Sequence, residues 1–206
     1  MSVSPPIHWA EPGDLSAVAA RIAAEVARPG AKRLAMAGGS TPGKVLEVLA
    51  ARSLDWTGTT IVPTDDRQVP VDHPASNLGA LRKAFAGTAA TIEPLVEGAK
   101  VAPFDLVWLG MGADGHIASL FPRMCAEQRN GRRVIAATPI PLPPEAPFAR
   151  LSLNRAALAA TRETILVATG AAKRRVIEAA LAGSDLHPVS DILRGAKAPV
   201  TIYWSE

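Results

Sequence analysis

Short apolar runs recur along this chain, and each of them is followed by glycine or polar residues. The run at 104–109 (FDLVWL) breaks at Gly110, and comparable runs occupy residues 34–37, 59–63, 164–169 and 200–204. Runs of this length without polar alternation are typical of strands that are buried on both faces of a parallel sheet. We therefore expect each of these segments to be a buried strand.

The segments between these runs carry helical spacing or helix-capping residues. Residues 14–28 predict an amphipathic helix with Asp14 as N-cap, ended by the Pro-Gly that follows. A second helix should follow the glycines at 38–39, with Thr41 as N-cap and Pro42 in the first position. Further helices are expected at 76–85, just beyond Asn154, at 170–181 and at 188–193. Alternating strands and helices predict one parallel, doubly wound sheet with right-handed crossovers.

Three segments have a weaker pattern. Residues 86–103 predict only a connection, while 134–137 and 150–153 predict short strands. The proline-rich segment 139–147 should be an extended loop, because proline is excluded from helix interiors and from the ladders of central strands.

Composition indicates an ordinary globular protein with one α/β domain over residues 1–206. Of the 206 residues, 48% are hydrophobic and 20% charged, and the net charge of +3 is scattered along the chain. Scattered charge argues against a nucleic-acid partner, and no apolar run could cross a bilayer. The single cysteine, Cys125, excludes an internal disulfide and is expected to be an inert thiol. With no signal-peptide pattern, we expect a cytoplasmic protein.

The first candidate for chemistry is Asp114-Gly115-His116, just beyond the strand at 104–109. Ligands bind in the crevice outside the carboxyl ends of such strands. A histidine can act as a general base there, and a carboxylate can orient it. The same residues could also form a glycine-rich turn with a solvated aspartate and a helix-capping histidine.

A second candidate is the segment GGSTPG at 38–43, between a predicted strand and a predicted helix. Glycines let backbone N–H groups approach an anion, the hydroxyls add donors, and a helix N-terminus favours negative charge. The segment matches neither the Walker A loop nor GxGxxG. The alternative is an ordinary, well-capped turn.

Arg67 and Lys173 are the candidate cations. Arg67 follows two aspartates at a strand end. A guanidinium at this position can hold a phosphate or a carboxylate. The alternative is that the three residues form a surface turn with its own ion pair. Lys173 falls in a helix first turn, where a cation opposes the helix dipole, so it either serves an anion or is simply solvated.

Taken together, these segments resemble the glucosamine-6-phosphate isomerase/6-phosphogluconolactonase family, and specifically its lactonases. The match runs from about residue 34 to 204 and rests on residues 38–42, 65–67, 76–77, 109–122, 150–153 and 170–173. The resemblance implies a modified Rossmann-like α/β fold, with a mainly parallel sheet and helices on both faces. It also implies hydrolysis of 6-phospho-D-glucono-1,5-lactone in the pentose phosphate pathway, without metal or organic cofactor, by a monomer or small homo-oligomer.

The resemblance also assigns roles to individual residues. His116 would be the general base that activates water and Asp114 would orient its ring, while Arg67 would serve either the phosphate or the carbonyl oxyanion. The expected substrate-binding residues are Gly38, Gly39, Ser40, Thr41, Asp65, Asn77, Gly115, Arg150 and Lys173. The other histidines, His8, His73 and His187, are expected to be surface or capping residues.

Three positions depart from the family pattern. Asp66 stands where glutamate is usual, Arg123 where glycine is common, and Leu142 near a position that usually carries lysine. The nearest enzymatic alternative is a glucosamine-6-phosphate deaminase or isomerase, whose motif continues Phe-Asn-Glu-Pro where this chain has SLFP at 119–122. A non-catalytic sugar-phosphate sensor is the other alternative, although no helix-turn-helix pattern precedes residue 34. A dinucleotide-binding Rossmann domain fits least well, because GxGxxG and the acidic ribose partner are missing.

Overall fold

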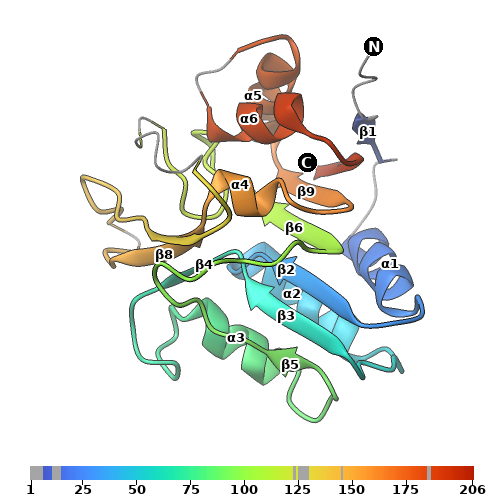
Figure 1. Ribbon diagram of the computed structural model, residues 1–206. Coiled ribbons are helices and arrows are strands. Elements are labelled where there is room, and N and C mark those ends of the chain that lie inside the picture. Colours follow the sequence, from blue (N-terminus) through green and yellow to red (C-terminus); the bar gives the residue numbers. More distant parts are fainter. Residues whose placement is uncertain (1–6, 11–14, 123, 125–129, 145, 185–186) are drawn as a thin grey trace.

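A seven-stranded parallel sheet forms the centre of the molecule (Figure 1). The computed structural model describes the chain except for residues 1–6, 11–14, 123, 125–129, 145 and 185–186. Every neighbouring pair in the sheet is parallel, in the order β1-β10-β9-β6-β2-β3-β5. The strands are β1 (Ile7–Trp9), β2 (Lys32–Met36), β3 (Thr59–Pro63), β5 (Thr91–Ile92), β6 (Leu106–Gly110), β9 (Thr164–Thr169) and β10 (Val200–Ser205).

Helices cover both faces of this sheet, as the sequence predicts. Successive side chains of a strand point to opposite faces, so Leu106 and Trp108 join one core cluster while Val107 and Leu109 join the other. The first cluster is completed by α1 (Leu15–Val26), α2 (Ser40–Ala50) and α3 (Asn77–Ala84). The second is completed by α4 (Arg155–Leu158), α5 (Ala171–Leu181) and α6 (Pro188–Gly195).

A small antiparallel sheet lies beside the main one. It consists of β4 (Asp65–Arg67), β8 (Arg150–Leu153) and β7 (Val134–Ala136), in the order β4-β8-β7. Only one residue, Thr64, separates β3 from β4, so the chain leaves the main sheet directly for the second one. The short strands expected at 134–137 and 150–153 are therefore present, but they pair with each other and with β4 and not with the parallel sheet.

The start of α2 corrects one prediction. The helix begins at Ser40 with Gly39 as N-cap, so Thr41 is not the cap and Pro42 is the third helical residue. Gly43 N donates to Gly39 O across this first turn. Proline is tolerated here because the first N–H groups of a helix have no intrahelical acceptor. The proposed N-cap of α1, Asp14, lies outside the described residues.

The carboxyl ends of β2, β6 and β9 meet the N-termini of α2 and α5 at one edge of the sheet. The small sheet stands next to this edge. Among the described residues, no helix is both long and apolar enough to cross a membrane.

Candidate active site

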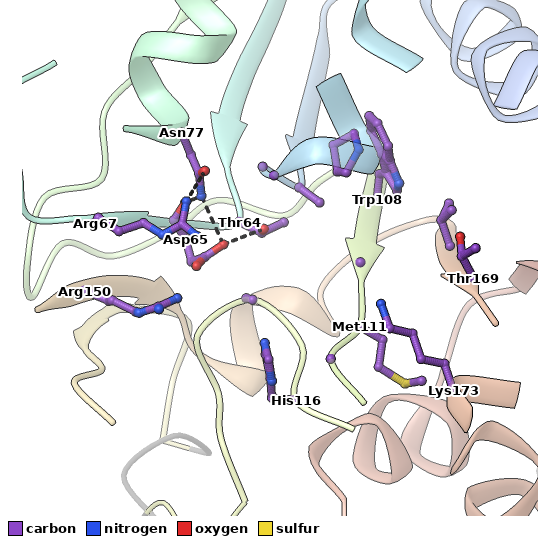
Figure 2. Close-up of a pocket in the computed structure, with 18 residues that line it drawn as sticks. Thr64, Asp65, Arg67, Asn77, Trp108, Met111, His116, Arg150, Thr169 and Lys173 are labelled. Carbon is purple, nitrogen blue, oxygen red and sulfur yellow. Dashed lines mark hydrogen bonds between the residues drawn. The ribbon is translucent and has the colours of Figure 1, made fainter. Parts of the chain in front are cut away.

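A pocket of about 230 Å³ opens at this edge of the sheet (Figure 2). Eight of the predicted site residues line it and therefore lie together in space: Gly38, Gly39, Asp65, Arg67, Asn77, His116, Arg150 and Lys173. They come from the loop between β2 and α2, from β4, α3, β8 and α5, and from the loop after β6. A second, wider groove, which runs along the proline-rich segment, shares Arg67, His116 and Arg150 with the pocket.

The loop after β6 holds Asp114 and His116 as a hydrogen-bonded pair. Asp114 Oδ1 lies 2.6 Å from His116 Nδ1 and also accepts a hydrogen bond from His116 N at 3.2 Å. Gly112 N donates to His116 O at 2.9 Å, which closes the loop. A Cβ at Gly112 would overlap the His116 ring and the Asp114 carboxylate, so glycine is required there. The carboxylate thus fixes both the orientation of the imidazole and the nitrogen that carries its proton.

Phe121 supports His116 from the side. The two ring centroids are 4.5 Å apart, and the guanidinium carbon of Arg150 lies 5.5 Å from the centroid of the same phenyl ring. One aromatic side chain therefore packs against both the imidazole and a cation of the pocket.

Two arginines face each other across the small sheet. Arg67 on β4 is the register partner of Arg150 on β8, and Arg150 is only 5% exposed. Arg67 Nη1 donates to Asn77 Oδ1 at 2.9 Å and to Ala75 O at 3.1 Å, while its buried Nε has no hydrogen-bond partner. Like charges held directly opposite in a sheet repel each other, so this pair favours an anion between or beside them.

The two aspartates of β4 have different surroundings. Asp65, 7% exposed, lines the pocket and accepts a hydrogen bond from Ser119 Oγ at 2.6 Å. Asp66 points away to the start of α3, where its carboxylate accepts hydrogen bonds from the N–H groups of Asn77 at 2.6 Å and Leu78 at 3.1 Å. The departure from the family pattern at Asp66 therefore concerns a helix-capping carboxylate and not a pocket residue.

Helix N-termini and a lysine form the opposite side of the pocket. Both α2 and α5 begin after a glycine with positive φ, Gly39 at 108° and Gly170 at 91°, and neither start is capped by a side chain. Their first N–H groups are left for a ligand, and the helix dipoles favour an anion. In the described part of the chain the Lys173 ammonium has no hydrogen-bond or ion-pair partner, and Figure 2 shows its side chain extending from α5 into the pocket.

The four other predicted residues are Asp114, Gly115, Ser40 and Thr41. Asp114 faces the wider groove and reaches the pocket through His116. Gly115, with φ of 77°, makes the turn between the pair and packs on His187. Ser40 and Thr41 form the start of α2, and the role of their hydroxyls stays a prediction.

The remaining histidines agree in part with their predicted role. His8 is exposed on β1, and His73 Nδ1 accepts a hydrogen bond from Ala75 N within a loop, as a capping residue would. His187 is the N-cap residue of α6 and also contacts the loop that carries Asp114 and His116. Cys125 and Arg123 lie outside the described residues.

Sequence reasoning assigned no role to three residues of the site: Trp108, Ser119 and Phe121. A tryptophan inside an apolar run is indistinguishable from core, and only the structure shows that Trp108 borders the pocket. Ser119 and Phe121 belong to the motif at 109–122, but their contacts join segments far apart in sequence.

Across the described residues, no three histidine, cysteine or acidic side chains are grouped so that they could hold a metal ion. The pocket thus brings together a histidine paired with an aspartate, three cationic side chains and two helix N-termini, in a crevice at the carboxyl edge of a parallel sheet. Fold and site together define an α/β protein with a cationic pocket beside a histidine that is paired with an aspartate.

Comparison with known proteins identifies the family. The model for glucosamine-6-phosphate isomerases/6-phosphogluconolactonase matches residues 15–95 and 83–204, and the chain belongs to this family. It is 35% identical to the 6-phosphogluconolactonase of Pseudomonas aeruginosa, over 91% of this chain and 87% of that protein. It is 36% identical to the 6-phosphogluconolactonase of Pseudomonas putida, over 91% and 85%. A crystal structure of a 6-phosphogluconolactonase from Shewanella baltica superposes with a TM-score of 0.81 at 28% identity, covering both chains completely.

Proposed function

We propose that this chain hydrolyses 6-phospho-D-glucono-1,5-lactone to 6-phosphogluconate. The observation that carries the proposal is the position of the Asp114–His116 pair in relation to the anion-binding side of the pocket. His116 and Lys173 line one small cavity, together with the start of α2. A substrate that fits must therefore present an anionic group and, a few atoms away, a centre that needs a base. A phosphorylated lactone has both.

His116 acts as the general base. Because Asp114 Oδ1 accepts the Nδ1 proton, Nε2 carries the free lone pair and takes a proton from water. The resulting hydroxide attacks the lactone carbonyl carbon, and the carbonyl π electrons move to its oxygen. The imidazolium that forms is stabilised by the Asp114 carboxylate.

The tetrahedral intermediate then collapses. The carbonyl re-forms, the bond from the carbonyl carbon to the ring oxygen breaks, and the imidazolium returns its proton to that oxygen. One water is consumed and the open-chain acid is released. Arg67, held by Asn77 and Ala75, supplies positive charge for the oxyanion of the intermediate.

The substrate phosphate lies at the N-termini of α2 and α5. Backbone N–H groups after Gly38 and Gly39 and the Lys173 ammonium bind its oxygens, and Arg150 adds positive charge from β8. By resemblance to the family, Ser40 and Thr41 at the start of α2 belong to the same set, while Asp65 and Asn77 border the sugar.

The test is a rate measurement on freshly prepared 6-phosphogluconolactone, with the spontaneous opening of the lactone subtracted. We expect a large acceleration by the protein and no release of ammonia from glucosamine 6-phosphate. Ammonia release would instead assign the deaminase reaction. Saturable binding of 6-phosphogluconate without any turnover would assign a sensor.

A further inference from the structure

Trp108 is a fully buried side chain with an unused hydrogen-bond donor. It lies on the central strand β6 and is 0% exposed, yet its indole Nε1 has no hydrogen-bond partner. An indole N–H can only donate, and a buried donor without an acceptor costs about 1–3 kcal/mol. The indole of Trp204, by comparison, donates to Gly170 O at 3.1 Å.

The position of Trp108 in β6 brings this donor to the pocket. Strand alternation places the side chain on the face covered by α1 and α2, near the carboxyl end of the strand. There it lines the pocket together with Pro42 in the first turn of α2 and with Val167 and Thr169 at the end of β9.

The donor is on the phosphate side of the pocket. In Figure 2 the Trp108 indole and the Lys173 side chain lie on one side of the cavity, and Arg67 and Arg150 lie on the other. The glycines that precede α2 also line this region. A ligand oxygen held by the α2 N-terminus and Lys173 lies on the same side of the pocket as the indole.

We propose that Trp108 Nε1–H donates a hydrogen bond to a phosphate oxygen of the bound sugar phosphate and so helps to select phosphorylated lactones. This inference rests on the proposed function. A phosphate monoester has three terminal oxygens with more lone pairs than Lys173 and the helix N–H groups can use. The core fixes the ring in advance, so no rotamer freedom is lost on binding. A ligand without this acceptor leaves the donor unsatisfied, as it is in the free protein, and gains no affinity from it.

Indole N–H resonances give a direct test. The chain has four tryptophans, so ¹⁵N-labelled protein has four indole cross-peaks, and a Trp108→Phe sample identifies the one of interest. On titration with 6-phosphogluconate, we expect the Trp108 proton to move downfield while gluconate leaves it in place. Binding of 6-phosphogluconate, seen by calorimetry, with an unmoved Trp108 peak overturns this inference alone. Absence of any binding overturns both the inference and the proposed function.

Kinetics separate this role from a packing role. Trp108→Phe keeps a ring in the core but removes the donor, and Trp56→Phe is a matched control. Trp56 is 2% exposed in the same core cluster and does not line the pocket. For Trp108→Phe we expect KM for the phosphorylated lactone to rise about tenfold with kcat retained. Glucono-1,5-lactone should be hydrolysed by the variant as by the wild type, and Trp56→Phe should leave both constants unchanged.

Two kinetic results would overturn the assignment. One is a KM for Trp108→Phe that equals that of Trp56→Phe. The other is an equal loss with both lactones, which would show that the ring supports the pocket and not the phosphate.

Discussion

The side chain of His187 is hydrogen-bonded to the loop that carries the Asp114–His116 pair: its Nδ1 lies 2.7 Å from the main-chain oxygen of Asp114. Two residues further on, Val189 N donates to Gly115 O at 3.1 Å. The start of α6 therefore holds the turn between Asp114 and His116 at two adjacent carbonyls. His187, expected to be a surface or capping residue, is the N-cap residue of α6 and also contacts this turn.

Removing the hydrogen bond from His187 to Asp114 O should slow the reaction without abolishing substrate binding. For His187→Ala we expect kcat to fall about tenfold with little change in KM, because small displacements of a catalytic group are costly. His187→Asn keeps a donor near the position of Nδ1 and should restore most of the rate. Equal losses in the two variants would show that the ring matters only for packing.

Gly112 should tolerate no side chain. Its Cβ would overlap both members of the Asp114–His116 pair, so Gly112→Ala is expected to lose at least 100-fold in kcat, on the scale of general-base catalysis, while remaining folded. The matched control is Gly43→Ala. A Cβ at Gly43 in α2 meets no atom within 4 Å, and alanine there should stabilise the helix by about 0.5–1 kcal/mol. Steady-state rates and urea unfolding of both variants check this, and an active Gly112→Ala would contradict the geometry of the loop.

Arg67 should act on the carbonyl and not on the phosphate. It lies across the pocket from Lys173 (Figure 2), and Asn77 holds it there. Loss of one donor to a developing oxyanion costs about 100- to 1,000-fold in kcat, so Arg67→Gln should show this loss with phosphorylated and unphosphorylated lactones alike. The exposed Arg133 provides the control, since Arg133→Gln should behave as wild type. A loss restricted to the phosphorylated lactone would assign Arg67 to the phosphate.

Asp66 should contribute to stability. Its carboxylate accepts hydrogen bonds from Asn77 N and Leu78 N at the start of α3, and such caps are worth about 1–2 kcal/mol. We expect Asp66→Ala to lower the free energy of unfolding by this amount in urea titrations, whereas Asp72→Ala, at an exposed loop position, should not. The Ser76 hydroxyl donates to the same carboxylate, and its oxygen accepts a hydrogen bond from Gly79 N. An unchanged unfolding midpoint for Asp66→Ala would show that Ser76 alone is enough to cap α3.

Much of the main sheet is predictable because its strands are local apolar runs. Strands β3 and β9 have the predicted bounds, and Ser76 and Asn154 cap α3 and α4 as their residue types suggest. Strands β1, β4 and β5 have only two or three residues, too few to give a periodic pattern. Their existence depends on partners distant in sequence, as in the pairing of Asp65 with Ser152.

The residues of the site were likewise predictable only in part. His116, Arg67 and Lys173 follow strand ends or helix starts, so topology alone brings them to one edge. What could not be predicted are contacts between distant segments. The bond from Ser119 to Asp65 spans 54 positions, and the bond from His187 to Asp114 spans 73. The position of the Trp108 indole N–H at the pocket could not be predicted for a different reason. A buried aromatic residue has the same sequence pattern whether or not it borders a cavity.

The measurement closest to the central claim is the hydrolysis of 6-phosphogluconolactone by His116→Ala beside His8→Ala. The first variant removes the proposed base, while the second removes an exposed histidine of β1. We predict that kcat falls by about 100- to 10,000-fold in His116→Ala and is unchanged in His8→Ala, with both variants folded by circular dichroism. A His116→Ala protein that keeps a rate close to wild type would contradict the assignment of His116 as the base.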